Sequence, residues 1–159
     1  MTRPTTPYSK YLGDCDPLDV MRETLGHIES LFHGWASERF ELSYAPGKWS
    51  ARQILTHLAQ TELALGLRVR FALTTPNYAA QPFDQDLWVA LESQVPGRTA
   101  LEAFLALARM DRLLFQSLSP AQRAIPFAHP EYGSLTVDWV IHQIAGHQVH
   151  HLRQLEQIG

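Results

Sequence analysis

Apolar side chains recur every three or four residues in four stretches of the chain, and this spacing is typical of amphipathic α-helices. The four stretches are residues 17–39, 50–73, 101–118 and 137–158. In the first stretch a single stripe contains Met21, Leu25, Ile28, Phe32 and Trp35. No segment shows the convincing alternation of a β-strand, so the pattern predicts an all-α protein, a four-helix bundle.

Each expected helix is preceded by a residue whose side chain can accept a hydrogen bond from the first turn. The predicted caps are Asp16, Ser50, Thr99 and Thr136. Ser50 is followed three residues later by Gln53, and Thr99 by Glu102, which is the capping-box pattern. These signals predict where the four helices begin.

Two longer connections join the expected helices. Residues 74–98 are rich in Pro, Asn and Gln and contain a short helical candidate at 84–93. Residues 119–134 contain three prolines and a turn-like segment at 129–133. We expect one domain over residues 1–159, with an irregular N-terminal segment at 1–15 and with both connections covering one end of the bundle.

Composition narrows the classes of function. The chain has 159 residues, 45% of them apolar and 18% charged, which fits one folded domain and excludes a disordered protein. The net charge of -3 and a pI near 6.2 offer no basic surface for nucleic acid. The single cysteine, Cys15, excludes a disulfide framework and fits a reducing cytoplasm. Neither a signal peptide nor a membrane-spanning stretch is expected.

Four of the eight histidines lie within residues 142–151. His147 and His151 are four residues apart, so they point within about 40° of each other on the face that the bundle should bury. Buried imidazoles need partners. Two interpretations remain open at this point: core histidines bonded to the backbone or to a carboxylate, or two ligands of one metal ion.

His57 in the second expected helix also borders the apolar stripe, which favours the metal interpretation. Three histidines from two helices match a catalytic site that keeps an open position, whereas structural zinc sites close with four ligands. Gln148 stands where the H-E-x-x-H motif has its glutamate base, so peptidase chemistry is disfavoured. A di-iron carboxylate site is excluded because no Glu has a His three residues later. Zinc, nickel, copper and iron all suit such a mononuclear site.

The remaining histidines show no comparable pattern. His150 lies on the shoulder of the same face, as an outer group of the site or as a solvated residue. His142 is predicted on the surface, and His27 and His33 are structural or exposed. His129 lies in a turn, where it either lines the mouth of a pocket or has no role.

Several polar residues could support the site. Gln154 and Asp138 are candidates for orienting the imidazoles, although surface exposure explains Asp138 as well. Glu62 lies about 140° around the helix from His57 and is not expected to be a ligand. Arg68 and Arg70 either bind an anionic cofactor carboxylate or lie solvated at a helix end.

Three segments of the chain resemble the DinB/YfiT superfamily: GKWSARQILTHLAQTE at 47–62, HPEYGSLT at 129–136 and HQIAGHQVHHLRQL at 142–155. The resemblance implies a four-helix bundle, commonly dimeric, with a divalent metal at one end. Carried over onto this chain, the ligands are His57, His147 and His151, the same three that helical geometry singles out. Members resemble thiol-dependent S-transferases or isomerases that use bacillithiol, mycothiol or glutathione, or are called metal-dependent hydrolases.

The resulting expectation is a cytoplasmic, homodimeric metal-dependent enzyme that acts on a small molecule. A divalent ion, zinc or nickel first and iron next, would activate a low-molecular-weight thiol or water for attack on an electrophile. The alternative is a non-catalytic bundle in which the histidines only bind metal or in which the fold only dimerises. The sequence does not identify the catalytic residues or the substrate.

Overall fold

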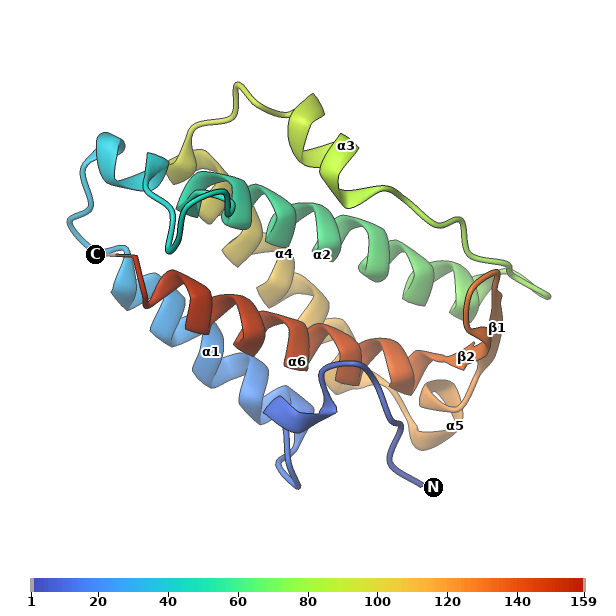
Figure 1. Ribbon diagram of the computed structural model, residues 1–159. Helices are drawn as coiled ribbons and strands as arrows, with labels where there is room; N and C mark the ends of the chain where they lie inside the picture. The colour runs from blue at the N-terminus through green and yellow to red at the C-terminus, as the bar shows by residue number, and fades with distance from the viewer. Residues whose placement is uncertain (1, 159) are drawn as a thin grey trace.

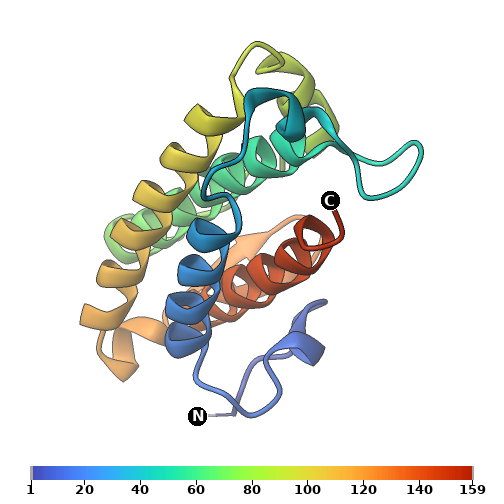
Figure 2. The same ribbon diagram turned by 90° about the vertical axis from the view of Figure 1, so that its left-hand side faces the viewer.

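Four long helices form the body of the computed structural model, which describes residues 2–158 (Figures 1 and 2). They are α1 (Pro17–Leu31), α2 (Ala51–Thr74), α4 (Gly97–Ser117) and α6 (Val137–Leu155). α6 packs against α1 and α2, and α4 packs against the same two helices from the other side. The predicted all-α four-helix bundle is therefore confirmed.

Short elements complete the fold. They are the 3₁₀-helices η1 (Ser9–Tyr11) and η2 (Ser37–Glu41), the helices α3 (Gln85–Leu91) and α5 (Pro120–Arg123), and the strands β1 (Pro126–His129) and β2 (Gly133–Thr136). The helical candidate at 84–93 is confirmed by α3, which Asp84 caps. Among the described helices, none has the length and apolar character needed to cross a membrane.

Three of the four predicted caps are confirmed. The Asp16 side chain accepts hydrogen bonds from the amides of the first turn of α1, and Thr136 does the same for α6. Ser50 and Gln53 form the complete capping box at the start of α2. These local signals therefore place the starts of the two helices that carry the candidate site.

The predicted start of the third helix was wrong. α4 begins at Gly97 with Pro96 as its cap, so Thr99 lies inside the first turn and caps nothing. The carbonyl of Pro96 already accepts a hydrogen bond from the amide of Ala100 at 3.0 Å. Gly97 lies against the ring of Phe40, where a Cβ atom would clash, so contact with a distant segment sets this start.

The first helix was predicted to be too long. α1 ends at Leu31 instead of residue 39, because Gly34 adopts a positive φ of 76° that an α-helix cannot accommodate. The chain then turns back, and Phe32, Trp35 and Phe40 pack together with ring centroids 4.5 to 5.5 Å apart. The predicted apolar stripe is thus buried, although its last members lie beyond the helix.

The expectation that the chain contains no strand was also wrong. β1 and β2 pair antiparallel around the predicted turn at 129–133, with Phe127 opposite Leu135. Each strand has four residues, which is too short to show a clear alternation. The hairpin also pairs with the 74–98 connection, where Ala79 bridges Ala128. It covers the end of the bundle where α6 begins (Figure 1).

The core consists of two apolar clusters along the bundle. On α2 one cluster ends at Ala59 and the other begins at Leu65; on α6 they are separated by residues 146–151. The intervening positions carry buried polar side chains. They are Gln60, Thr61, Glu62, Asp111, His147, Gln148 and His151, and His57 adjoins them. This buried polar layer contains the candidate site.

Candidate metal centre

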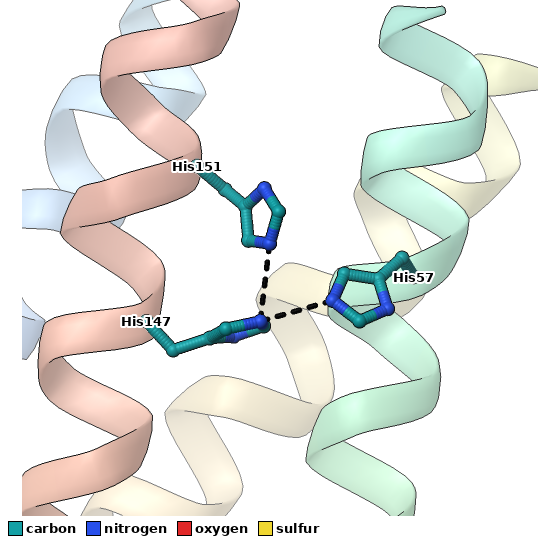
Figure 3. Close-up of side chains that lie close together, drawn as sticks. All are labelled: His57, His147 and His151. Carbon is teal, nitrogen blue, oxygen red and sulfur yellow. Dashed lines mark hydrogen bonds between the residues drawn. The ribbon is translucent and has the colours of Figure 1, made fainter. Parts of the chain in front are cut away.

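The three predicted ligands meet in the polar layer. α2 presents His57, and α6 presents His147 and His151 one turn apart, with a nitrogen of each ring pointing toward the same place (Figure 3). The Nε2 atom of His147 lies 2.9 Å from that of His57 and 3.0 Å from that of His151. All three side chains are buried. The packing of α2 against α6 therefore brings together the three histidines that the sequence singled out.

The protons on these nitrogens cannot satisfy both contacts. Each short contact between imidazole nitrogens needs one hydrogen between them, and the single in-plane position on His147 Nε2 serves only one such bond well. In addition, Nδ1 of His57 is buried without a partner among residues 2–158. Several lone pairs directed at one point are the arrangement that a cation relieves, so the donor set fits a divalent metal ion.

Gln154 sets the tautomer of His151. Its Oε1 lies 2.7 Å from His151 Nδ1, while its Nε2 donates to the hydroxyl of Tyr44 at 3.2 Å. Since Oε1 can only accept, Nδ1 of His151 carries the proton and Nε2 keeps its lone pair toward the cluster. The predicted contact between Gln154 and a cluster imidazole is confirmed.

Burial keeps the three imidazoles neutral. Desolvation, with a smaller contribution from His150, lowers the pKa of His57 to about 4. Desolvation and the neighbouring His57 lower the pKa of His151 to about 3. For the same reasons the pKa of His147 lies well below its usual value. At pH 7 all three therefore present lone pairs, the form that a metal ion requires.

Two cavities adjoin the cluster. The first, of about 310 Å³, is lined by all three histidines together with Tyr8, Tyr44, Trp49 and His150, among others. The second, of about 270 Å³, adjoins His57 and His147 and extends toward Arg68 and His129. The cluster is thus open on two sides to spaces that small molecules can enter.

The N-terminal segment forms one wall of both cavities. Tyr8 packs edge-on against His147 with ring centroids 5.2 Å apart and lines each cavity. A Cβ atom on Gly146 would lie 2.7 Å from the carbonyl oxygen of Tyr8, so glycine is needed for this segment to lie on α6. Both views show the segment running beside α6 (Figures 1 and 2).

Two of the other histidines also line these cavities. His150 is half-buried, and its Nδ1 lies 2.8 Å from the hydroxyl of Tyr11. His129 is buried in the hairpin turn, and its Nδ1 accepts a hydrogen bond from the amide of Glu131 at 3.1 Å. His129 therefore lines a pocket, the first of the two roles considered for it. His27 and His33 are exposed, as expected.

Two predictions on α6 were wrong. His142 is buried instead of exposed, because the N-terminal segment and α5 cover this side of α6. Asp138 neither contacts the cluster nor lies exposed on the surface; it is buried, pairs with Arg123 at 2.6 Å and lies 3.6 Å from His142. Both residues lie where the N-terminal segment and α5 pack on α6, and helical periodicity does not reveal that contact.

Sequence reasoning missed a group of buried polar side chains next to the cluster. Gln148 donates to Glu62 at 2.6 Å, and Arg70 pairs with Asp111 at 2.7 Å. Burial first, and then the neighbouring Asp111, raises the pKa of Glu62 well above its usual value. Glu62 bonds to Gln148 and does not belong to the cluster of three histidines, as expected. The signal was available: Glu62 and Asp111 both continue apolar helical stripes.

The sequence and the fold agree on the family. The family model of the DinB superfamily matches residues 20–155, and the chain belongs to that superfamily. A protein of Oceanobacillus iheyensis named "Putative metal-dependent hydrolase" is 31% identical over 123 residues, which cover 77% of this chain and 72% of that protein.

Two solved structures share the fold. YfiT from Bacillus subtilis, described as "a probable metal-dependent hydrolase with an unusual four-helix bundle topology", superposes with a TM-score of 0.80 at 19% identity, covering 99% of this chain and 90% of that one. A mycothiol-dependent maleylpyruvate isomerase superposes with a TM-score of 0.72 at 14% identity, covering 94% of this chain and 61% of that one. At these identities the two structures show the fold alone.

Proposed function

We propose that the protein is a metal-dependent enzyme in which His57, His147 and His151 hold one divalent ion. The observation that carries this proposal is the convergence of three neutral imidazoles at a point that opens into two cavities. Zinc or nickel is the expected ion, and iron is the next candidate. The naming of the Oceanobacillus relative supports metal-dependent chemistry in this family.

The proposed reaction is attack by an activated thiol or water on an electrophilic small molecule. A bound divalent ion lowers the pKa of a thiol or water molecule beside it, and so supplies a nucleophile at neutral pH. The chain contributes the neutral imidazoles, the Gln154 contact that orients His151, and the side chains of Tyr8 and Trp49 in the cavity wall. A thiol cosubstrate gives S-transfer; water gives hydrolysis.

The cavities favour an enzyme over the alternative of a non-catalytic metal-binding bundle. An ion that only joins α2 to α6 needs neither an open side nor adjoining space. Here the cluster borders volumes of about 310 and 270 Å³. Space for both a cosubstrate and a substrate fits the thiol-transfer form of the proposal, and the name of the mycothiol-dependent structural relative points the same way.

Metal content and thermal melting test the proposal. Tag-free wild type, His57→Ala and His147→Ala are stripped with EDTA, reloaded with zinc or nickel, and assayed by elemental analysis. We expect about one equivalent in wild type and loss of it in both variants. His150→Ala is the matched control, because His150 lines the same cavity without joining the cluster, and it should keep the ion. Absence of metal from wild type, with no melting shift, contradicts the proposal.

Activity assays then separate the two reactions. The loaded protein is incubated with monobromobimane and either bacillithiol, mycothiol or glutathione, and separately with p-nitrophenyl acetate. Metal-dependent conjugation that His57→Ala abolishes supports S-transfer, whereas metal-dependent ester cleavage without a thiol supports hydrolysis. If neither reaction exceeds the rate of the metal-free protein, the non-catalytic alternative is favoured.

We further propose a cytoplasmic homodimer. Leu63, Leu67 and Phe71 repeat every four residues on α2 and are 51%, 51% and 42% exposed, which forms an apolar stripe suited to a second copy. The free, exposed Cys15 fits a reducing compartment. Light scattering should give twice the mass of the chain for wild type and the monomer mass for Leu67→Glu. A monomeric wild type contradicts the dimer.

A further inference from the structure

The second cavity runs along α2 away from the histidines. His57, Thr61, Leu65 and Arg68 all line it, and their spacing of four, four and three residues places them on one face of the helix. The helical rise separates the α-carbons of His57 and Arg68 by about 16 Å. The cavity of about 270 Å³ that both residues line leaves room for a small, elongated ligand.

Arg68 is a buried cation whose hydrogen-bonding capacity is largely unused. Its residue is 8% exposed, and the guanidinium donates to the main-chain carbonyl of Gln81 at 2.9 Å. Among residues 2–158 it forms no ion pair with a carboxylate. Burial lowers the pKa of Arg68, which shows that its charge is poorly solvated. A planar fork of free N–H donors matches a carboxylate.

Thr61 offers a second unused group. It is 6% exposed, and its hydroxyl is buried without a partner among the described residues. Thr56 and Thr74 on the same helix donate to the carbonyl four residues earlier, at 2.9 and 2.7 Å. A buried hydroxyl without a hydrogen bond destabilises the fold unless a partner reaches it. Because Thr61 lines the second cavity, rotation about its Cα–Cβ bond can bring this hydroxyl to a ligand there.

His129 supplies a third donor from the hairpin. Its Nδ1 accepts hydrogen bonds from the amides of Glu131 and Tyr132, so in the neutral ring the proton lies on Nε2. Burial and the nearby Arg68 both lower the pKa of His129, which keeps the ring neutral at pH 7. The Nε2–H group is thus a donor in the wall of the same cavity.

We propose that this cavity binds the carboxylate of a small organic acid, with Arg68 as the charged partner and Thr61 and His129 as additional donors. A carboxylate fits better than a phosphate, because Glu131 also lines the cavity and repels a second negative charge. The identification of this acid as the substrate or the thiol cosubstrate rests on the proposed function. Binding of the carboxylate itself does not.

Calorimetric titration of the metal-free protein tests the site. Pentanoate is titrated at pH 7 into EDTA-treated wild type, Arg68→Gln, and the control Arg109→Gln, whose exposed arginine pairs with Glu29. We expect Arg68→Gln to bind pentanoate at least about tenfold more weakly and Arg109→Gln to bind it as wild type does. The neutral analogue pentanamide should not bind wild type. Equal binding by Arg68→Gln, or no binding by wild type, overturns the proposal.

Two further measurements complete the test. Thr61→Val preserves the shape of the side chain, so it provides a second test if Arg68→Gln fails to fold. It should weaken pentanoate binding several-fold, and unchanged binding counts against the site. Both titrations use metal-free protein, so their results stand whether or not the protein binds zinc. In zinc-loaded protein, tighter binding of 5-mercaptopentanoate than of pentanoate assigns the carboxylate to the thiol cosubstrate; equal binding assigns it to the substrate.

Discussion

Acid should destabilise the metal-free protein through its histidine cluster. The perturbation is a change from pH 7.5 to pH 5.0 in EDTA, applied to wild type and to His57→Gln. His57 titrates near 6.5 in the unfolded chain and near 4 in the folded protein. Between these values the unfolded state binds a proton that the folded state excludes. Stability is therefore full above pH 6.5 and falls as the pH decreases toward 4.

The magnitude follows from the size of the shift. Each pH unit between 6.5 and the folded pKa lowers the free energy of unfolding by about 1.4 kcal/mol per histidine. At pH 5, which is 1.5 units below 6.5, the loss is therefore about 2 kcal/mol. His151, with a folded pKa of about 3, contributes a similar amount. The substitution His57→Gln removes only the contribution of His57 to this acid-induced loss of stability. Wild type should therefore lose about 2 kcal/mol more than His57→Gln over this pH change.

Urea denaturation followed by far-ultraviolet circular dichroism measures the effect at both pH values. His27→Gln is the matched control, because His27 is an exposed histidine on α1. It should lose as much stability as wild type between pH 7.5 and pH 5.0. If His57→Gln loses stability as steeply as wild type, burial of neutral imidazoles is not the source of the acid sensitivity, and the reasoning is refuted.

Three other substitutions test neighbouring features. Glu62→Gln should raise the melting temperature by several degrees at pH 8 and little at pH 4. At pH 8 the unfolded chain releases the Glu62 proton, whereas the folded protein keeps it because burial raises the pKa of Glu62, and glutamine removes this cost of folding. An equal change in melting temperature at both pH values contradicts this. Gln154→Leu should weaken zinc binding about 10- to 100-fold in a chelator competition, with the exposed Gln157→Leu unchanged. Gly146→Ala should lower the free energy of unfolding by about 1–3 kcal/mol and make the N-terminal segment accessible to limited proteolysis. Gly26→Ala should not destabilise the fold, because a Cβ atom at Gly26 has no neighbour within 4 Å.

Helical periodicity was a sound guide where one face of a helix meets a single core. It predicted the extent of α2 and α6, three of the four caps, and the positions of His57, His147 and His151 on buried faces. It failed where distant segments decide the outcome. Gly97 starts α4 early because it packs on Phe40, and His142 is buried because the N-terminal segment covers it. Neither contact can be recognised from the spacing of apolar residues along the chain.

The sequence by itself determined the helices, their apolar faces and the residue types that can form a metal centre. These depend on neighbours within about one helical turn, so local spacing carries the information. Only the tertiary structure decided that three Nε2 atoms converge and that Arg68 lies in a cavity beside them. It also paired Glu62 with Gln148 across the bundle. Such contacts join residues far apart in the chain, and their geometry depends on how whole helices pack.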